Sequence, residues 1–287
     1  MTTTSIEWTD ATWNPVTGCT KVSPGCAHCY AEGVAERFWG TQYPRVEMMT
    51  PESGESHTRP REFTDVLTHT DRLDQPLGWR RPRRVFVNSM SDLFHEAVSD
   101  AFLHQVYGVM EQARQHTFQV LTKRATRMKD YLSWRYGPRE DGPGSRIPSR
   151  HIWHGVSVEN RAFLGRIDEL KDTQSAVRFV SMEPLLEDVG ALMLDRIDWV
   201  IVGGESGPKA RPCDVAWVYS IVRECQRQDV AVFVKQLGAN PRSEAPTTWP
   251  NGTITPSPWL RPNLSNRKGG DMAEWPADLR VREYPRP

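Results

Sequence analysis

The sequence predicts an α/β protein built as a partial (β/α) TIM-type barrel with an irregular insertion and a C-terminal tail. Three observations favour this fold: short apolar runs rich in β-branched residues, helical patterns between them, and polar residues directly after the runs. Near-continuous apolar runs are typical of strands buried on both faces of a parallel sheet. Their alternation with helices indicates a barrel or a doubly wound sheet. We favour the barrel, because all its strand ends converge on one mouth.

The predicted strands, in chain order, cover 84–87, 118–121, 152–156, 177–180, 199–202 and 230–234. Between them, three segments carry apolar residues at helical spacing. The first begins after Ser99, a typical N-cap residue, and continues to Ala113; the second covers 160–172; the third begins after Asp214. Strand and helix therefore alternate along most of the chain.

Two regions interrupt this alternation. Residues 43–83 are rich in Pro, Arg and Glu, and we interpret them as an insertion with one weak helical stretch over 63–73. Residues 241–287 are rich in Pro, Trp and Gly, and they predict an irregular extension that packs on the barrel. The barrel with its insertion is therefore expected within 1–240.

Composition limits the classes of function. The 287 residues contain 36 Lys+Arg and 36 Asp+Glu, so the formal net charge is zero, and any contact with nucleic acid must use a local patch. The longest apolar runs are too short to span a membrane, and the N-terminus has no signal-peptide pattern. We expect a cytoplasmic protein with no membrane partner. An odd count of five cysteines argues against a disulfide framework.

Three of the cysteines, Cys19, Cys26 and Cys29, lie within eleven residues, and we call residues 19–29 the cysteine loop. Three thiolates on one loop can bind three corners of a [4Fe–4S] cluster and leave one iron open. Glycine and proline within the loop permit a tight backbone path, and a helix is expected from Tyr30. The alternative is a zinc site that adds His28. We favour the cluster, because adjacent His28 and Cys29 are poorly placed to bind one ion and no second Cys-x-x-Cys pair exists.

The cysteine loop resembles the cluster loop of the radical S-adenosylmethionine (radical SAM) superfamily, in which an aromatic residue such as Tyr30 adjoins the third cysteine. The departure is in the spacing: six residues separate the first two cysteines here, whereas three are commonest in the superfamily. A closer resemblance covers nearly the whole chain and is to a phage- and bacteria-associated three-cysteine-motif family. The segments that carry it are 6–10, 13–15, 18–19, 22–26, 29–31, 182–185, 203–207 and 268–270. Some members are similar in activity to spore photoproduct lyase, which reverses a thymine-dimer lesion in DNA.

The resemblance implies a [4Fe–4S] cluster and S-adenosylmethionine as cofactors, and an electron donor such as flavodoxin or ferredoxin as a partner. DNA with damaged thymines is the expected substrate. Two alternatives stay open. One is radical modification of another nucleic acid or of a small molecule. The other is a non-enzymatic, phage-associated binding protein with a structural iron–sulfur or zinc site.

Polar residues at the strand ends are candidates for binding the cofactor, because carboxylates and amides suit its ammonium and ribose groups and a lysine suits its carboxylate. The Gly-Gly-Glu segment at 203–205 lies later than the comparable segment of the superfamily, so we expect only that it approaches substrate or adenosine. The candidates are Tyr30, Asn88, Ser89, Ser91, Asp92, Lys123, Ser157, Glu159, Asn160, Glu183, Gly203, Gly204 and Glu205.

Two further expectations concern the substrate. Cys213 follows the strand 199–202 and is the candidate catalytic residue, as a donor of a hydrogen atom to a product radical; the alternative is a small apolar filler. Arg124, Arg127 and Lys129 are expected to form a basic rim at the mouth, with Trp153 or nearby tryptophans as a stacking wall for bases.

Overall fold

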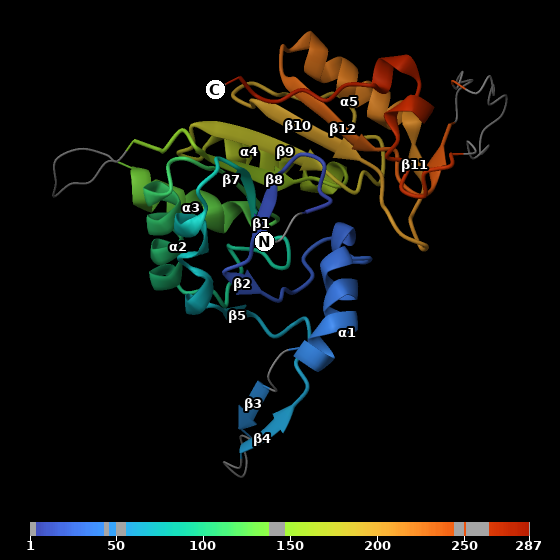
Figure 1. The fold of residues 1–287 in the computed structure, drawn as a ribbon. Coiled ribbons are helices and arrows are strands. Elements are labelled where there is room, and N and C mark those ends of the chain that lie inside the picture. Colours follow the sequence, from blue (N-terminus) through green and yellow to red (C-terminus); the bar gives the residue numbers. More distant parts are fainter. Residues whose placement is uncertain are drawn as a thin grey trace.

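A seven-stranded parallel sheet, curled into a half-barrel, forms the centre of the computed structural model (Figure 1). The structure describes residues 4–42, 46–49, 56–137, 147–243, 250 and 264–286. The strand order is β1 (Ala11–Trp13), β6 (Arg84–Val87), β7 (Thr117–Thr122), β8 (Ile152–Ser157), β9 (Val177–Met182), β10 (Trp199–Gly203) and β12 (Ala231–Gln236). The predicted partial barrel is therefore confirmed, including all six predicted strands.

The first strand, β1, was not predicted. It has three residues and pairs in parallel with β6, with Ala11 opposite Val85. Three residues are too few to show the alternation of apolar and polar residues that predicts a strand. This strand is evident only from its pairing with β6. It matters for the site, because the chain leaves β1, passes through the short strand β2 (Val16–Thr17) and enters the cysteine loop.

Helices cover the outer face of the sheet (Figure 1). The predicted helices are confirmed as α2 (Asp100–Gln112), α4 (Gly165–Lys171) and α5 (Val215–Arg227), and α1 (Tyr30–Gln42) begins directly after the cysteine loop. Ser99 caps α2 by accepting a hydrogen bond from the Phe102 amide, and Asp214 caps α5 in the same way. The helix α3 (Ala125–Tyr136) is additional. The residues of this helix are polar on average, so its sequence does not reveal the buried side, which includes Met128 and Leu132.

Short strands and 3₁₀ helices lie between the main elements. Residues 63–73 do not form the predicted helical stretch as a whole: they contain β5 (Leu67–Thr68), which pairs antiparallel with β2, and only the short 3₁₀ helix η2 (Thr70–Arg72), where η marks a 3₁₀ helix. The insertion also carries a hairpin of β3 (Val46–Met49) and β4 (Ser56–Arg59). The other short elements are η1 (Pro24–Cys26), η3 (Gln75–Gly78), η4 (Arg161–Phe163), β11 (Cys213–Asp214), β13 (Pro241–Arg242), η5 (Met272–Glu274) and η6 (Ala277–Leu279).

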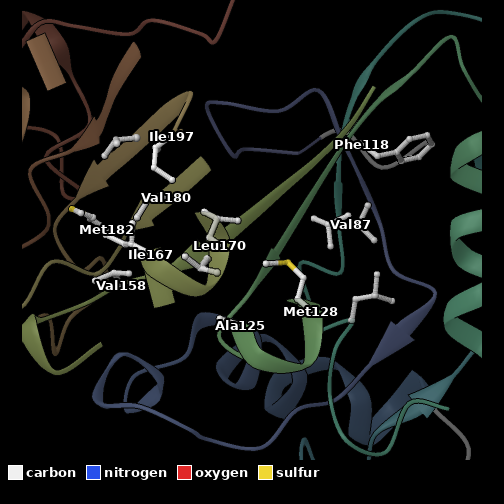
Figure 2. Packing of buried hydrophobic residues seen from close by; sticks show 14 of the residues in the cluster. Val87, Phe118, Ala125, Met128, Val158, Ile167, Leu170, Val180, Met182 and Ile197 are labelled. Carbon is white, nitrogen blue, oxygen red and sulfur yellow. The ribbon is translucent and has the colours of Figure 1, made fainter. Parts of the chain in front are cut away.

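Strand residues alternate between two hydrophobic cores. The outer core lies between the sheet and the helices and includes Val87, Phe118, Met128 and Leu170 (Figure 2). The inner core fills the concave side of the half-barrel with aromatic rings and branched aliphatic side chains. Its members are Trp8, Phe86, Trp153, Val177, Phe179, Trp199, Ile201 and Phe233. The inner core therefore closes the bottom of the half-barrel, below the carboxyl ends of the strands.

The C-terminal segment lies along β12. The amide of Val234 donates to the Val281 carbonyl, and the amide of Glu283 donates to the Val232 carbonyl, each at 2.9 Å. The Trp199 indole also donates to the Glu283 carbonyl at 2.9 Å. This pairing covers an edge strand that would otherwise expose its hydrogen-bonding groups. Within the described ranges, the structure contains no helix with the length and apolar character needed to cross a membrane.

Candidate functional site

A cavity of about 270 Å³ lies at the carboxyl ends of the strands, and all three loop cysteines line it. The alternation that sends Phe86 and Leu121 into the half-barrel continues past the strand ends, so polar side chains follow apolar ones on the same inner face. Most of the predicted site residues therefore meet in one place. Those lining the cavity are Cys19, Cys26, Cys29, Tyr30, Asn88, Ser89, Ser91, Asp92, Lys123, Ser157, Glu183, Gly204 and Glu205.

Four predicted residues do not line the cavity: Glu159, Asn160, Gly203 and Cys213. Glu159 and Gly203 lie immediately behind residues that line the cavity, Gly25 and Glu183. Cys213 is 1% exposed and belongs to the outer core, in a strand paired with β13. Burial raises the pKa of its thiol to about 12. The structure thus places Cys213 among packed apolar side chains, apart from the cavity wall.

The start of the cysteine loop is fixed by backbone hydrogen bonds. The Gly18 amide donates to the Met90 carbonyl at 3.1 Å, and the Cys19 amide donates to the Phe63 carbonyl at 2.9 Å. Gly18 has a φ of +93°, and a Cβ there would lie 2.3 Å from the Asp65 carbonyl oxygen. Only glycine fits both constraints, which explains the residue that precedes the first cysteine.

The first side-chain anchor of the loop is Glu159, which follows β8 and is 0% exposed. Its Oε1 accepts a hydrogen bond from the Ser23 hydroxyl at 2.8 Å and lies 3.2 Å from the Lys123 ammonium. Its Oε2 accepts from Arg166 at 3.1 Å. A Cβ on Gly25 would lie 2.4 Å from the Glu159 side chain, so the loop backbone rests directly on this carboxylate.

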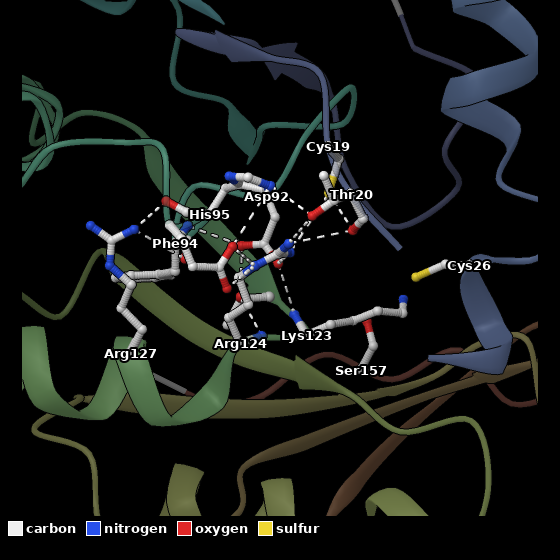
Figure 3. Close-up of polar contacts among 12 residues, drawn as sticks. Cys19, Thr20, Cys26, Asp92, Phe94, His95, Lys123, Arg124, Arg127 and Ser157 are labelled. Carbon is white, nitrogen blue, oxygen red and sulfur yellow. Dashed lines mark hydrogen bonds and ion pairs between the residues drawn. The ribbon is translucent and has the colours of Figure 1, made fainter. Parts of the chain in front are cut away.

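The second anchor is Arg124, which follows β7 and whose side chain is 5% exposed (Figure 3). Its guanidinium donates to the Thr20 carbonyl and hydroxyl oxygens and to Cys19 Sγ, the last at 3.7 Å. Asp92 and Glu96 hold the other side of the guanidinium at 3.1 and 2.9 Å. Burial, reinforced by Asp92, raises the pKa of the Cys19 thiol to about 11, although Arg124 acts in the opposite direction.

The third anchor is the pair Glu205–Arg211, which follows β10. Arg211 binds both carboxylate oxygens, at 3.0 and 2.7 Å, and also donates to the Pro24 carbonyl at 2.9 Å. The His28 ring lies 3.2 Å from the same carboxylate. Burial favours a higher pKa for Glu205, but the hydrogen bonds from Arg211 and His28 outweigh it, and the pKa is lowered.

These contacts divide the predicted residues into two groups. Asp92, Glu159 and Glu205 have their carboxylate oxygens engaged by protein donors: Glu159 and Glu205 contact the cysteine loop directly, and Asp92 holds Arg124. Other polar groups face the cavity with bonding capacity to spare. The Asn88 Nδ2 atom is buried without a hydrogen-bond partner, and the Glu183 carboxylate and Lys235 ammonium lie 3.0 Å apart in the cavity wall.

Four residues of the anchors and the cavity wall were not predicted from the sequence: Ser23, Arg166, Arg211 and Lys235. Only Lys235 had a usable signal, because it continues the inner-facing alternation of Ala231 and Phe233 in a predicted strand.

The predicted basic rim is wrong for two arginines and for the tryptophan. Arg124 is buried in the network above, and Arg127 donates to the carbonyls of His95 and Val98 and to Asp100. Trp153 is 8% exposed and belongs to the inner core. The alternation within β8 sends the Trp153 ring into the half-barrel. Arg124 lines the cavity but is 8% exposed, and Arg127 keeps 26% of its side chain exposed while its guanidinium is bound by neighbouring loops.

The donor set suits some metals better than others. In the part of the chain that the structure describes, no three His, Cys, Asp or Glu side chains are gathered closely enough to hold one metal ion. Tetrahedral zinc needs four donors within about 2.0–2.3 Å of a single ion. An iron–sulfur cubane instead binds each cysteine at a different iron, so its three cysteines need not converge on one point.

Comparisons with known proteins give one match. No curated protein and no solved structure matches the chain. One family model does, and it covers residues 3–272, nearly the whole chain, including the cysteine loop and all seven strands of the half-barrel. The chain belongs to the family described as "Protein of unknown function (DUF5131)".

Proposed function

We propose that this chain is a radical SAM enzyme in which Cys19, Cys26 and Cys29 hold a [4Fe–4S] cluster. The observation that carries the proposal is the presence of all three thiols and the polar strand ends in the wall of one cavity. In (β/α) barrels, active sites lie at this end of the strands. Three soft thiolates are the ligands that an iron–sulfur cluster requires, and a fourth iron would keep an open position.

Bound together, the cluster and S-adenosylmethionine would supply one-electron radical chemistry. The protein supplies binding and enclosure. Glu183 offers a carboxylate for an ammonium or ribose hydroxyl, Lys235 offers an ammonium for a carboxylate, and the free Asn88 Nδ2 offers a hydrogen-bond donor. Trp8 and Phe86 of the inner core form an apolar floor of the cavity.

Metal analysis tests the cluster. Protein purified and reconstituted without oxygen should be brown and contain about four irons per chain, as a cubane requires. The Cys26→Ala variant should lose the colour, whereas Cys225→Ala, a change in the outer core, should keep it. One tightly bound zinc and no iron would reject the proposal.

Cofactor cleavage tests the activity. Reduced, cluster-loaded protein should release 5′-deoxyadenosine from S-adenosylmethionine, and the Cys26→Ala variant should release none. A full cluster without any cleavage would favour the alternative, a binding protein with a structural cluster.

The substrate is a separate part of the proposal. A spore photoproduct-type thymine lesion in DNA is the substrate that the family resemblance implies, with another nucleic acid or a small molecule as the alternative. The engaged guanidinium groups of Arg124 and Arg127 lend the DNA substrate no support. Incubation with the dinucleotide lesion decides: restored thymines support repair, and normal cofactor cleavage without repair rejects it while leaving the radical chemistry intact.

A further inference from the structure

The Arg124 guanidinium has a partner at every nitrogen (Figure 3). Its Nε lies 2.9 and 3.0 Å from the two Glu96 oxygens, and one terminal nitrogen binds Thr20. The other terminal nitrogen lies 3.1 Å from Asp92 Oδ2 and 3.7 Å from Cys19 Sγ. A planar fork held on three sides cannot rotate without breaking several charge-assisted hydrogen bonds. The N–H group that faces the sulfur is therefore fixed in direction.

Asp92 is itself held rigidly. Its Oδ1 accepts from the Thr122 hydroxyl at 2.7 Å and from the Phe94 amide at 3.0 Å, and its Oδ2 accepts from the Lys123 amide at 3.1 Å. An arginine guanidinium stays protonated in proteins, and here Asp92 Oδ2 and Glu96 Oε1 lie 3.1 and 2.9 Å from the Arg124 nitrogens. Arg124 is therefore a permanent cation beside Cys19.

The three thiols do not share this environment. Cys19 receives a hydrogen bond from a cation, whereas Cys26 lies 3.7 Å from the neutral Ser23 hydroxyl. Among the described residues, no side-chain donor contacts the Cys29 sulfur. Hydrogen bonds to the cysteine sulfurs and nearby charge are two of the factors that set the reduction potential of an iron–sulfur cluster. A buried cation exerts a larger effect than a surface one, because solvent and salt screen it less.

We propose that Arg124 raises the reduction potential of a cluster bound at the cysteine loop, by donating a hydrogen bond from a fixed cation to the Cys19 thiolate. The inference rests on the proposed function and adds to it a residue outside the cysteine motif. The physical reason is charge: one-electron reduction adds a negative charge to the cluster, and the adjacent cation stabilises that charge. Arg124 is thus a positioning and tuning residue for the thiolate, and its effect is measurable without any substrate.

The experiment compares midpoint potentials, measured by dithionite titration followed by electron paramagnetic resonance, in anaerobically reconstituted full-length protein. Arg124→Gln removes the positive charge. Arg124→Lys keeps the charge but loses the planar arrangement of N–H donors. Arg135→Gln is the matched control, because Arg135 is also a buried arginine: it lies in α3, its side chain is 7% exposed, and Glu111 is its bidentate partner. We expect a more negative potential for Arg124→Gln, a smaller negative shift for Arg124→Lys, and the parent value for Arg135→Gln.

The outcomes separate the two proposals. A parent protein that binds zinc or no metal rejects the proposed function, and the inference with it. If the parent and Arg124→Gln both carry a full cluster at the same potential, the inference is wrong and the proposed function stands. If Arg124→Gln fails to bind iron, Arg124→Lys decides: a negative shift relative to Arg135→Gln supports the role, and the parent value overturns it.

Discussion

The contact between Gly25 and Glu159 permits a test of how the cysteine loop is supported. In Gly25→Ala, the new Cβ would lie 2.4 Å from both Cγ and Oε1 of Glu159. Ordinary contact begins at about 3.4 Å, so the two groups must separate by about 1 Å. Glu159 cannot move freely, because it is fully buried and bound by Lys123 and Arg166. Most of the displacement should therefore fall on the cysteine loop.

Overpacking of this kind costs about 1–3 kcal/mol. We expect Gly25→Ala to lower the free energy of unfolding by that amount and to reduce the iron bound per chain after anaerobic reconstitution. Gly33→Ala is the matched control. Gly33 lies within α1, four residues after Cys29, and a Cβ there meets no atom within 4 Å. Alanine in a helix interior should stabilise by about 0.5–1 kcal/mol.

Two measurements on each variant check the reasoning: urea unfolding, and iron content against protein concentration. Equal iron content and equal unfolding midpoints for Gly25→Ala and Gly33→Ala would show that the cysteine loop does not rest on Glu159. A loss of stability with full iron content would mean that Glu159 moves and the loop does not.

Arg211→Gln should lower the free energy of unfolding in urea by about 1–3 kcal/mol, because it leaves the buried Glu205 carboxylate with too few hydrogen-bond donors. The double variant Glu205→Gln with Arg211→Gln should recover part of this loss, and strictly additive effects of the two substitutions would contradict the pairing. Burial lowers the pKa of His154 to about 3, so below pH 6.5 the unfolded chain binds a proton that the folded chain does not, and stability should fall as the pH decreases. At pH 5, about 1.5 pH units below the ordinary histidine pKa, the loss is about 2 kcal/mol, and His154→Gln should flatten the slope between pH 6.5 and 4; an unchanged slope would contradict this origin. Replacing any one loop cysteine by serine should lower iron content more than Cys213→Ser does, because Cys213 lies outside the cavity wall; equal losses would contradict that placement.

The sequence by itself determined the main frame and most of the residues that line the cavity. Apolar runs longer than three residues were sufficient for six strands, because burial on both faces imposes a local composition. The cysteine spacing and the polar strand ends identified the residues around the cavity, because the carboxyl ends of parallel strands meet whatever their order. Local pattern failed for β1, which has too few residues, and for β5, whose extended form depends on its pairing with β2.

Only the tertiary structure decided which groups hold the loop and which face a ligand. Ser23 and Glu159 are 136 positions apart, and Pro24 and Arg211 are 187 apart. A charge in a sequence does not show its partner, because ion pairs form wherever folding brings loops from separate strands together. Trp153 and Arg124 illustrate the same limit: a strand residue can face solvent or the inner core, and an arginine can form a rim or a buried anchor. The curvature of the sheet decides both, because it creates the concave face that encloses the ring and the mouth at which the guanidinium meets Asp92 and the cysteine loop.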